Sequence, residues 1–193
     1  PIDQITVTNS GGGSFDTGSE VVVLGWDPAD THSTNFWEEL TSVDLSSVAY
    51  GTITSKKYLW FQASYVASGG TLIPQLQVGN GGLDTTSNYS ERVSTNGGAD
   101  GAGAPRADIS INPDTLDSGE NGFVNGFIIN NSANEKLMMG NTVHTSTAEA
   151  TTAPVRREWV GKWANTSNQI DTLGFIFTGT GTATGTLKIW GSD

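Results

Sequence analysis

The chain has no cysteine among its 193 residues, and only 9 lysines and arginines stand against 20 aspartates and glutamates. The missing cysteines exclude disulfide bonds, thiolate metal ligands and thiol nucleophiles. A net charge of -11 repels phosphate backbones, and no basic run is long enough to reverse that field locally, so nucleic acid is not an expected partner. No apolar run approaches the roughly 20 residues that span a bilayer, so membrane insertion is not expected either.

Charged residues are also scarce, at 15% of the chain, whereas glycine occurs 25 times and serine, threonine and asparagine fill most gaps between apolar runs. This composition disfavours helices and favours turns and β-branched strands. The length is sufficient for one good core. We therefore expect a single domain over residues 20–193, preceded by an arm, residues 1–19, that contains the flexible sequence GGGS.

The clearest predicted strand covers residues 58–66, where apolar and polar side chains alternate. Similar runs predict strands at residues 20–25, 122–130, 136–144, 171–177 and 186–190, with shorter candidates at 39–45, 72–77 and 89–94. The segment after Asn35 fits either a short helix capped by Asn35 or a strand. Turn sequences rich in glycine and asparagine separate the runs. The pattern predicts an all-β fold, an antiparallel β-sandwich of jelly-roll type with an extended N-terminal arm.

Catalytic residues are hard to assemble from this sequence. His32 and His144 are the only histidines available as a base, and no G-x-S-x-G turn presents a serine. We interpret His144 as a surface residue of a strand. Glu38 and Glu39 are adjacent and would point to opposite faces of a strand, so they do not form a carboxylate pair. The sequence therefore gives no reason to expect an enzyme.

Loop acids are the one candidate for metal binding. Asp114, Asp117 and Glu120 supply oxygen ligands of the kind that calcium prefers. Their spacing does not match an EF-hand loop, and acidic residues in exposed loops are usually only solvated. Calcium binding by this loop is therefore a hypothesis, and no other cofactor is expected.

Six tryptophans offer rings for either sugar binding or packing. Trp26 and Trp60 are the candidates for glycan contact. Trp159 and Trp163 would share one face of a strand, on either side of Gly161, which suits packing between sheets as well as an interface.

The adjacent Arg156 and Arg157 are better explained by an ion pair with Glu158 or an acidic loop than by a phosphate site. The candidates for an interface between copies of the chain are Ile5, Val7, Trp37, Arg156, Arg157, Trp159, Trp163 and Trp190. Three sequons, at Asn88, Asn130 and Asn165, would accept glycans if the chain met suitable machinery.

Six segments carry a resemblance to a known family: FWEEL, KKYLWFQASYV, NYSERVSTNGGADGA, FIINNSANEKLMMGNTV, APVRREWVGKWANTSNQI and GTGTATGTLKIWGSD. Together they resemble a family of virion structural proteins from tailed and other environmental viruses. The resemblance runs from about Phe36 to the C-terminus and leaves out the arm. It implies an assembly role, in a capsid, a decoration or a tail, and no catalytic residues.

The leading hypothesis is a non-enzymatic structural protein of a virus particle, located in a virion or outside cells, whose partners are copies of itself and other virion proteins. One alternative is a carbohydrate-binding module or tail protein that recognises cell-surface glycans. Another is an extracellular filament or surface-layer subunit. In the leading hypothesis the arm adds a strand to a neighbouring copy, so deleting residues 1–19 is expected to leave a folded monomer that no longer assembles.

Overall fold

The computed structural model describes residues 5–8, 11–15, 17, 19–21, 37–47, 49–112, 114–145 and 150–193. The chain divides into two compact units, Pro1–Thr34 and Asn35–Asp193. In the first unit, the described residues form no helix or strand, so the strand predicted at residues 20–25 is not seen in Glu20 and Val21. The rest of that segment lies outside the described residues, together with Trp26 and His32.

The second unit is built from strands. Its described residues contain no helix, and the strands are β1 (Glu38–Asp44), β2 (Tyr50–Thr52), β3 (Tyr58–Ser68), β4 (Leu72–Gly79), β5 (Tyr89–Thr95), β6 (Gly101–Arg106), β7 (Asn121–Ile129), β8 (Lys136–His144), β9 (Val155–Trp163), β10 (Thr172–Gly179) and β11 (Thr182–Ser192). A helix able to cross a membrane does not occur in the described part of the chain.

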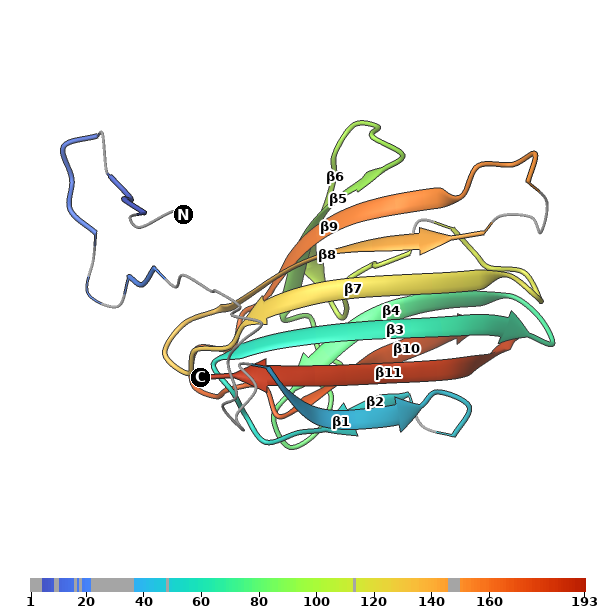
Figure 1. Ribbon diagram of the computed structural model, residues 1–193, viewed down its shortest axis with the longest axis horizontal. Coiled ribbons are helices and arrows are strands. Elements are labelled where there is room, and N and C mark those ends of the chain that lie inside the picture. The colour runs from blue at the N-terminus through green and yellow to red at the C-terminus, as the bar shows by residue number, and fades with distance from the viewer. Residues whose placement is uncertain are drawn as a thin grey trace, which may run out of the picture. The chain divides into compact units, whose positions relative to one another are not determined.

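Two antiparallel sheets make up the second unit (Figure 1). Eight strands form one sheet in the order β1-β11-β3-β7-β8-β9-β5-β6, and three form the other in the order β2-β10-β4. The predicted all-β antiparallel sandwich is therefore confirmed. The predicted jelly-roll connectivity is not confirmed, because a jelly roll divides eight strands between two sheets through paired Greek keys.

The segment that follows Asn35 is a strand, which resolves the choice left open by the sequence. Strand β1 pairs with β11 from Glu38 opposite Gly191 to Asp44 opposite Thr186. Its register shifts between Glu39 and Thr41. Pairing with a long neighbouring strand supplies the backbone hydrogen bonds that a short helix would have made internally.

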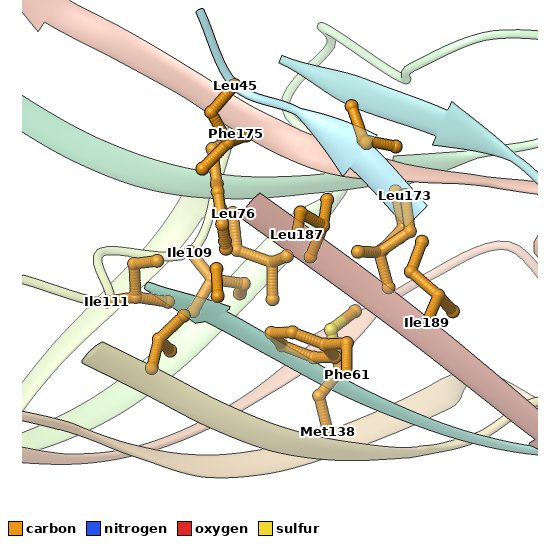
Figure 2. Packing of buried hydrophobic residues seen from close by; sticks show 14 of the residues in the cluster. Leu45, Phe61, Leu76, Ile109, Ile111, Met138, Leu173, Phe175, Leu187 and Ile189 are labelled. Carbon is orange, nitrogen blue, oxygen red and sulfur yellow. The ribbon is translucent and has the colours of Figure 1, made fainter. Parts of the chain in front are cut away.

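The core lies between the two sheets, and Figure 2 shows residues from both. Phe61 from β3 and Leu187 from β11 belong to the large sheet, whereas Leu76 from β4 and Phe175 from β10 belong to the small one. The ring centroids of Phe61 and Phe175 are 6.4 Å apart at an interplanar angle of 64°. This edge-to-face contact joins the layers.

A loop strip extends the small sheet beyond β4. Ile109 and Leu116 form isolated bridges with Leu76 and Leu72, and the backbone nitrogen of Leu76 donates to the carbonyl of Ile109 at 2.9 Å. Both Ile109 and Leu116 are fully buried. The strip therefore covers core that three strands alone would leave open.

Candidate interaction surface

The large sheet has one face toward the core and one turned away from it, which we call the outer face. Along β7 and β8, buried and less buried residues alternate without exception. The outward residues of β7 include Phe123, Phe127 and Ile129, all exposed. Large apolar side chains are thus presented to solvent by a central strand of the sheet.

Strand β8 has an inverted polarity. Its buried positions include Lys136, Thr142 and His144, whereas Leu137 and Met139 are 56% and 60% exposed. In a strand with one buried face, the apolar residues usually turn inward. In β8, Lys136, Thr142 and His144 face the core beside Met138, whereas Leu137, Met139 and Val143 face solvent beside Asn141.

Hydrogen bonds hold β8 in this register. The indole Nε1 of Trp159 donates to Oγ1 of Thr142 at 3.2 Å. The ammonium of Lys136 donates to the carbonyl oxygens of Asn134 and Asn165, both at 2.7 Å. Slipping β8 by one residue would break these bonds and turn every side chain over.

The prediction that His144 is a surface residue is wrong, although its assignment to a strand is confirmed. His144 is only 2% exposed, and its Nδ1 lies 3.0 Å from the carbonyl oxygen of Thr145. The apolar neighbours Leu137, Met139 and Val143 take the outward positions, which leaves His144 on the inner face.

Strand registers bring outward side chains into rows across the sheet. The row that we call the apolar row contains Trp190 of β11, Trp60 of β3, Phe127 of β7, Met139 of β8 and Val160 of β9. Beside it, toward one end of the strands, lie Tyr58, Ile129 and Leu137. Cross-strand neighbours of this kind make a continuous surface, since adjacent strands are about 4.8 Å apart.

A row of amides follows on the other side of the apolar row. Gln62, Asn125 and Asn141 are direct neighbours on β3, β7 and β8, and we call them the amide row. Oδ1 of Asn125 accepts hydrogen bonds from Trp60 Nε1 at 2.7 Å and from Gln62 Nε2 at 3.2 Å. Beyond the amides the surface is apolar again, with Phe123 opposite Val143.

Four aromatic rings gather at one side of the apolar row. Trp60 and Trp190 stack with centroids 4.4 Å apart, and Trp60 and Phe127 stack at 6.0 Å and 11°. Trp37 adds an edge contact to Trp60 at 6.1 Å and a tilted contact to Phe127 at 6.3 Å. Because Trp60 lies between two stacked neighbours, its ring faces are turned toward Trp190 and Phe127 rather than toward solvent.

Charges are confined to the two sides of the outer face. Three described strands, β3, β7 and β8, form its centre, and none of their outward residues is charged. At the β1 side, Lys188 Nζ lies 3.0 Å from Glu39 Oε2. At the β5 side, Arg92 lies 3.6 Å from Asp100. The centre is thus apolar or amide-bearing, and its borders are charged.

Two of the predicted interface residues are not on the surface. Trp159 and Trp163 are 1% and 2% exposed and belong to the core, so the prediction that they form an interface is not supported and packing between the sheets is their role. They share a face, as the sequence indicated. Trp163 Nε1 donates to Oδ2 of Asp84 at 2.8 Å, which satisfies the polar atom of a buried indole.

The arginine pair splits between the two faces of β9. Arg156 is exposed and its Nη1 lies 3.8 Å from Glu158, the ion pair that the sequence suggested. Arg157 points inward, and its Nη1 donates to the carbonyl oxygens of Ser110 and Asn112 at 3.0 and 2.7 Å. Burial lowers the pKa of Arg157. Arg157 therefore ties β9 to the loop strip and does not serve an interface.

The other predicted interface residues lie in both units. Trp37 and Trp190 are partly exposed on the outer face, with the rings described above. Ile5 and Val7 are exposed in the first unit. Sequence reasoning missed the exposed apolar residues of β7 and β8, because runs such as FVNGFII are apolar on both faces and do not reveal which one is outward.

The loop acids proposed for calcium are not gathered around one point. Oε2 of Glu120 accepts a hydrogen bond from the backbone nitrogen of Asp117 at 2.8 Å, which closes the turn before β7. Within the described ranges, no three histidines or acids are grouped so that they could hold a metal ion. Calcium at Asp114, Asp117 and Glu120 remains a prediction from the sequence.

The three sequons differ in how accessible their asparagine side chains are. Asn130 is fully buried, and its Nδ2 donates to the carbonyl oxygens of Lys56 and Ile170 at 2.9 and 3.0 Å, so this nitrogen is not accessible in the folded chain. Nδ2 of Asn88 donates to Asp84 at 2.8 Å but lies at the surface. Asn165 uses its Oδ1 to accept from the backbone nitrogens of Ser167 and Asn168.

Shallow hollows mark the β5 side of the outer face. One, of about 370 Å³, is lined by residues that include Leu137, Val160 and Lys162. A second of similar volume shares Arg92 and Val160 with it and adds Met139. The outer face is therefore concave where its apolar row meets the charged border.

Comparison of the chain with protein-family models, with curated proteins and with solved structures finds no match. Function must therefore be argued from the outer face itself.

Proposed function

We propose that the chain is a non-enzymatic structural protein that assembles with copies of itself, and that copies associate through the outer face of the large sheet. The inverted polarity of β8 carries this proposal. Leu137 and Met139 would contribute to the core if they faced inward, and each exposes apolar surface whose burial is worth about 25 cal/mol per Å². Such exposure is explained when another surface covers it.

The size of the outer face suits a stable interface. From β1 to β5 there are seven neighbouring strands, which at about 4.8 Å per spacing measure roughly 29 Å across. Nine residues along a strand measure roughly 30 Å. The area is on the order of 850 Å², close to the roughly 800 Å² that each partner contributes to a standard interface.

The distribution of side chains also suits a protein interface. Interface centres are depleted in charge and enriched in aromatic residues and methionine, and their rims are polar. The outer face has Phe127 and Met139 at its centre. Its charged residues, such as Glu39 and Arg92, lie at the borders.

A carbohydrate-binding module is the alternative from another class, and the aromatic geometry argues against it at Trp60. A sugar stacks on an open ring face, and the faces of Trp60 are turned toward Trp190 and Phe127. The exposed side chains around Met139, such as Leu137 and Val160, are aliphatic and offer neither rings nor hydrogen bonds to a sugar. A filament or surface-layer subunit would use the same face and differ in where it is found.

The proposal that the chain belongs to a virus particle rests on the six sequence segments described above. Virion shells and tails are built from many identical subunits, so a self-complementary surface suits that setting. Electron microscopy of native material separates a virion component from a cellular filament.

The test is the oligomeric state of the full chain in sedimentation equilibrium. The wild type is expected to form dimers or larger species at about 10–100 µM, and Leu137→Asp to sediment as a folded monomer. Ile73→Asp is the matched control, since Ile73 is a partly exposed apolar residue of β4 in the other sheet. The proposal is wrong if the wild type is a monomer throughout, or if Leu137→Asp and Ile73→Asp associate equally.

A further inference from the structure

We infer that two copies meet outer face to outer face about a two-fold axis that runs parallel to β7. This inference rests on the proposed function and specifies the partner as a second copy in one arrangement. Strand β7 is the middle of the seven strands from β1 to β5, with β1, β11 and β3 on one side and β8, β9 and β5 on the other. Rotation about β7 therefore places β1 over β5, β11 over β9 and β3 over β8 of the second copy.

The same rotation keeps every cross-strand row opposite itself, and the apolar row becomes complementary to its own copy. Trp60 lies over Met139 of the second copy, and Phe127 lies over Phe127. Sulfur against an aromatic ring is a favourable contact. Aligned sheets pack at about -30°, a turn about the sheet normal that leaves the centre of the face at Phe127 in place and shifts the ends of each row along the strands.

The charges at the ends of the row are also complementary. Glu39 of β1 lies opposite Trp190, and Arg92 of β5 lies opposite Val160. These two charged residues therefore extend the apolar row, one at each end. The rotation places Glu39 over Arg92 of the second copy. By two-fold symmetry this contact forms twice.

The amide row gives a second set of matches. Lys188 is opposite Gln62 on one side of this row, and Glu158 is opposite Asn141 on the other. Lys188 therefore lies over Glu158 of the second copy. Gln62 lies over Asn141, and because each amide both donates and accepts, their burial need leave no polar group unpaired.

The other in-plane axis gives a worse match. A two-fold axis across the strands, through Asn125, would place β1 over β1 and bring Glu39 over Asp44 of the second copy, two acids. It would also place Trp190 over Thr186 and Trp60 over Ser64, and only Phe127 and Met139 would meet apolar partners, Phe123 and Val143. Like charges and mismatched polarity both disfavour association.

Sedimentation equilibrium of two charge reversals tests the arrangement. Glu39→Arg places two positive charges together in each contact of its homodimer, and Arg92→Glu places two negative charges together. Each variant alone is expected to raise the dissociation constant of the dimer at least tenfold. Mixed one to one, they form a heterodimer in which Arg at position 39 faces Glu at 92 and the native Glu39 faces the native Arg92. The mixture is therefore expected to return to within about threefold of the wild type.

Asp114→Arg, an exposed reversal in a loop outside the outer face, is the control and is expected to leave the dissociation constant unchanged. If the wild type associates but the reversals have no effect, or mixing restores nothing, the two-fold arrangement is wrong while self-association stands. If the wild type does not associate at all, the proposed function is wrong as well.

Discussion

Trp60 and Trp190 stack across β3 and β11 with their ring centroids 4.4 Å apart and their planes 25° from parallel. The pair stands on the outer face, within the apolar row, and Trp60 also stacks on Phe127. Its rings support one another, so we expect them to contribute to stability as well as to the surface that a second copy covers.

A double-mutant cycle with Trp60→Leu and Trp190→Leu measures the interaction energy between the two rings. Each replacement is expected to lower the free energy of unfolding by about 2 kcal/mol, with a coupling of about 1 kcal/mol between them, the value typical of aromatic pairs. Urea denaturation gives the four free energies. Rings that served only to bind a sugar would show no coupling and would lose glycan-array binding on substitution.

Asp84 is the second site with a clear prediction. Burial alone would raise the pKa of Asp84, but hydrogen bonds from Asn88, Thr86 and Trp163 outweigh it and lower the pKa to about 2. A carboxyl group with a lowered folded-state pKa stabilises the fold above its ordinary value of about 3.9, and this contribution is lost as the pH falls from about 4 toward 2.

Asp84→Asn is therefore expected to lower the free energy of unfolding at pH 7 by about 2 kcal/mol, the scale of hydrogen bonds to a charged group. Between pH 4 and 2 the variant loses less stability than the wild type, as thermal unfolding at several pH values can show. The comparison is Asp44→Asn, because the exposed carboxylate of Asp44 accepts hydrogen bonds from nearby Ser46, which lower its pKa without the burial and the Trp163 contact of Asp84, so a smaller effect of the same sign is expected. Parallel pH profiles for wild type and Asp84→Asn would contradict this account.

Gly140 lies beneath the indole ring of Trp159. A methyl group at Gly140 would collide with Trp159 and with the carbonyl oxygen of Asn125, and Gly126, directly opposite, is similarly crowded by Phe61 and Trp159. Gly140→Ala is expected to lower the free energy of unfolding by about 3 kcal/mol. In Gly101→Ala the new methyl group meets only Val93, at an ordinary 3.6 Å, so this control is expected to be neutral or slightly stabilising. Equal changes in the free energy of unfolding for Gly140→Ala and Gly101→Ala, measured by urea denaturation, would contradict the close packing at Gly140.

Removal of residues 1–19 tests whether the arm or the outer face carries the association between copies. Among the described residues, the strands and the buried core lie within Glu38–Ser192, so the shortened chain is expected to fold with unchanged circular dichroism. If the outer face carries the association, the dimer survives this deletion in sedimentation equilibrium. If the arm adds a strand to a neighbour, as the sequence suggested, the same deletion yields a monomer.

Much of the fold follows from local patterns. Alternation predicted the strand at residues 136–144 with the bounds that β8 has, and the strand at residues 58–66 within β3. Strand β6 was missed, because Gly101–Arg106 has no large apolar side chain and forms by pairing with β5. Strand β11 begins at Thr182, before the strand predicted at residues 186–190, because the glycine- and threonine-rich stretch that precedes Thr186 also pairs with β3.

The candidate surface was less predictable than the fold. Lys136, Thr142 and His144 alternate with Leu137, Met139 and Val143, and simple patterning turns the second set inward. The observed orientation depends on partners distant in the sequence, such as Trp159 for Thr142 and Asn165 for Lys136. Long-range contacts of this kind are not visible in a local pattern.

The chain has 2 methionines, adjacent in β8 and on opposite faces, and they provide the most direct test that the outer face is covered. Met139 is 60% exposed and Met138 is 3% exposed. Mild peroxide oxidation followed by mass spectrometry can compare samples above and below the dissociation constant of the dimer. We predict that Met139 is oxidised quickly in the dilute sample and is protected in the concentrated one, while Met138 is protected in both. Equal oxidation of Met139 at both concentrations, in a sample shown to be associated, would contradict the account.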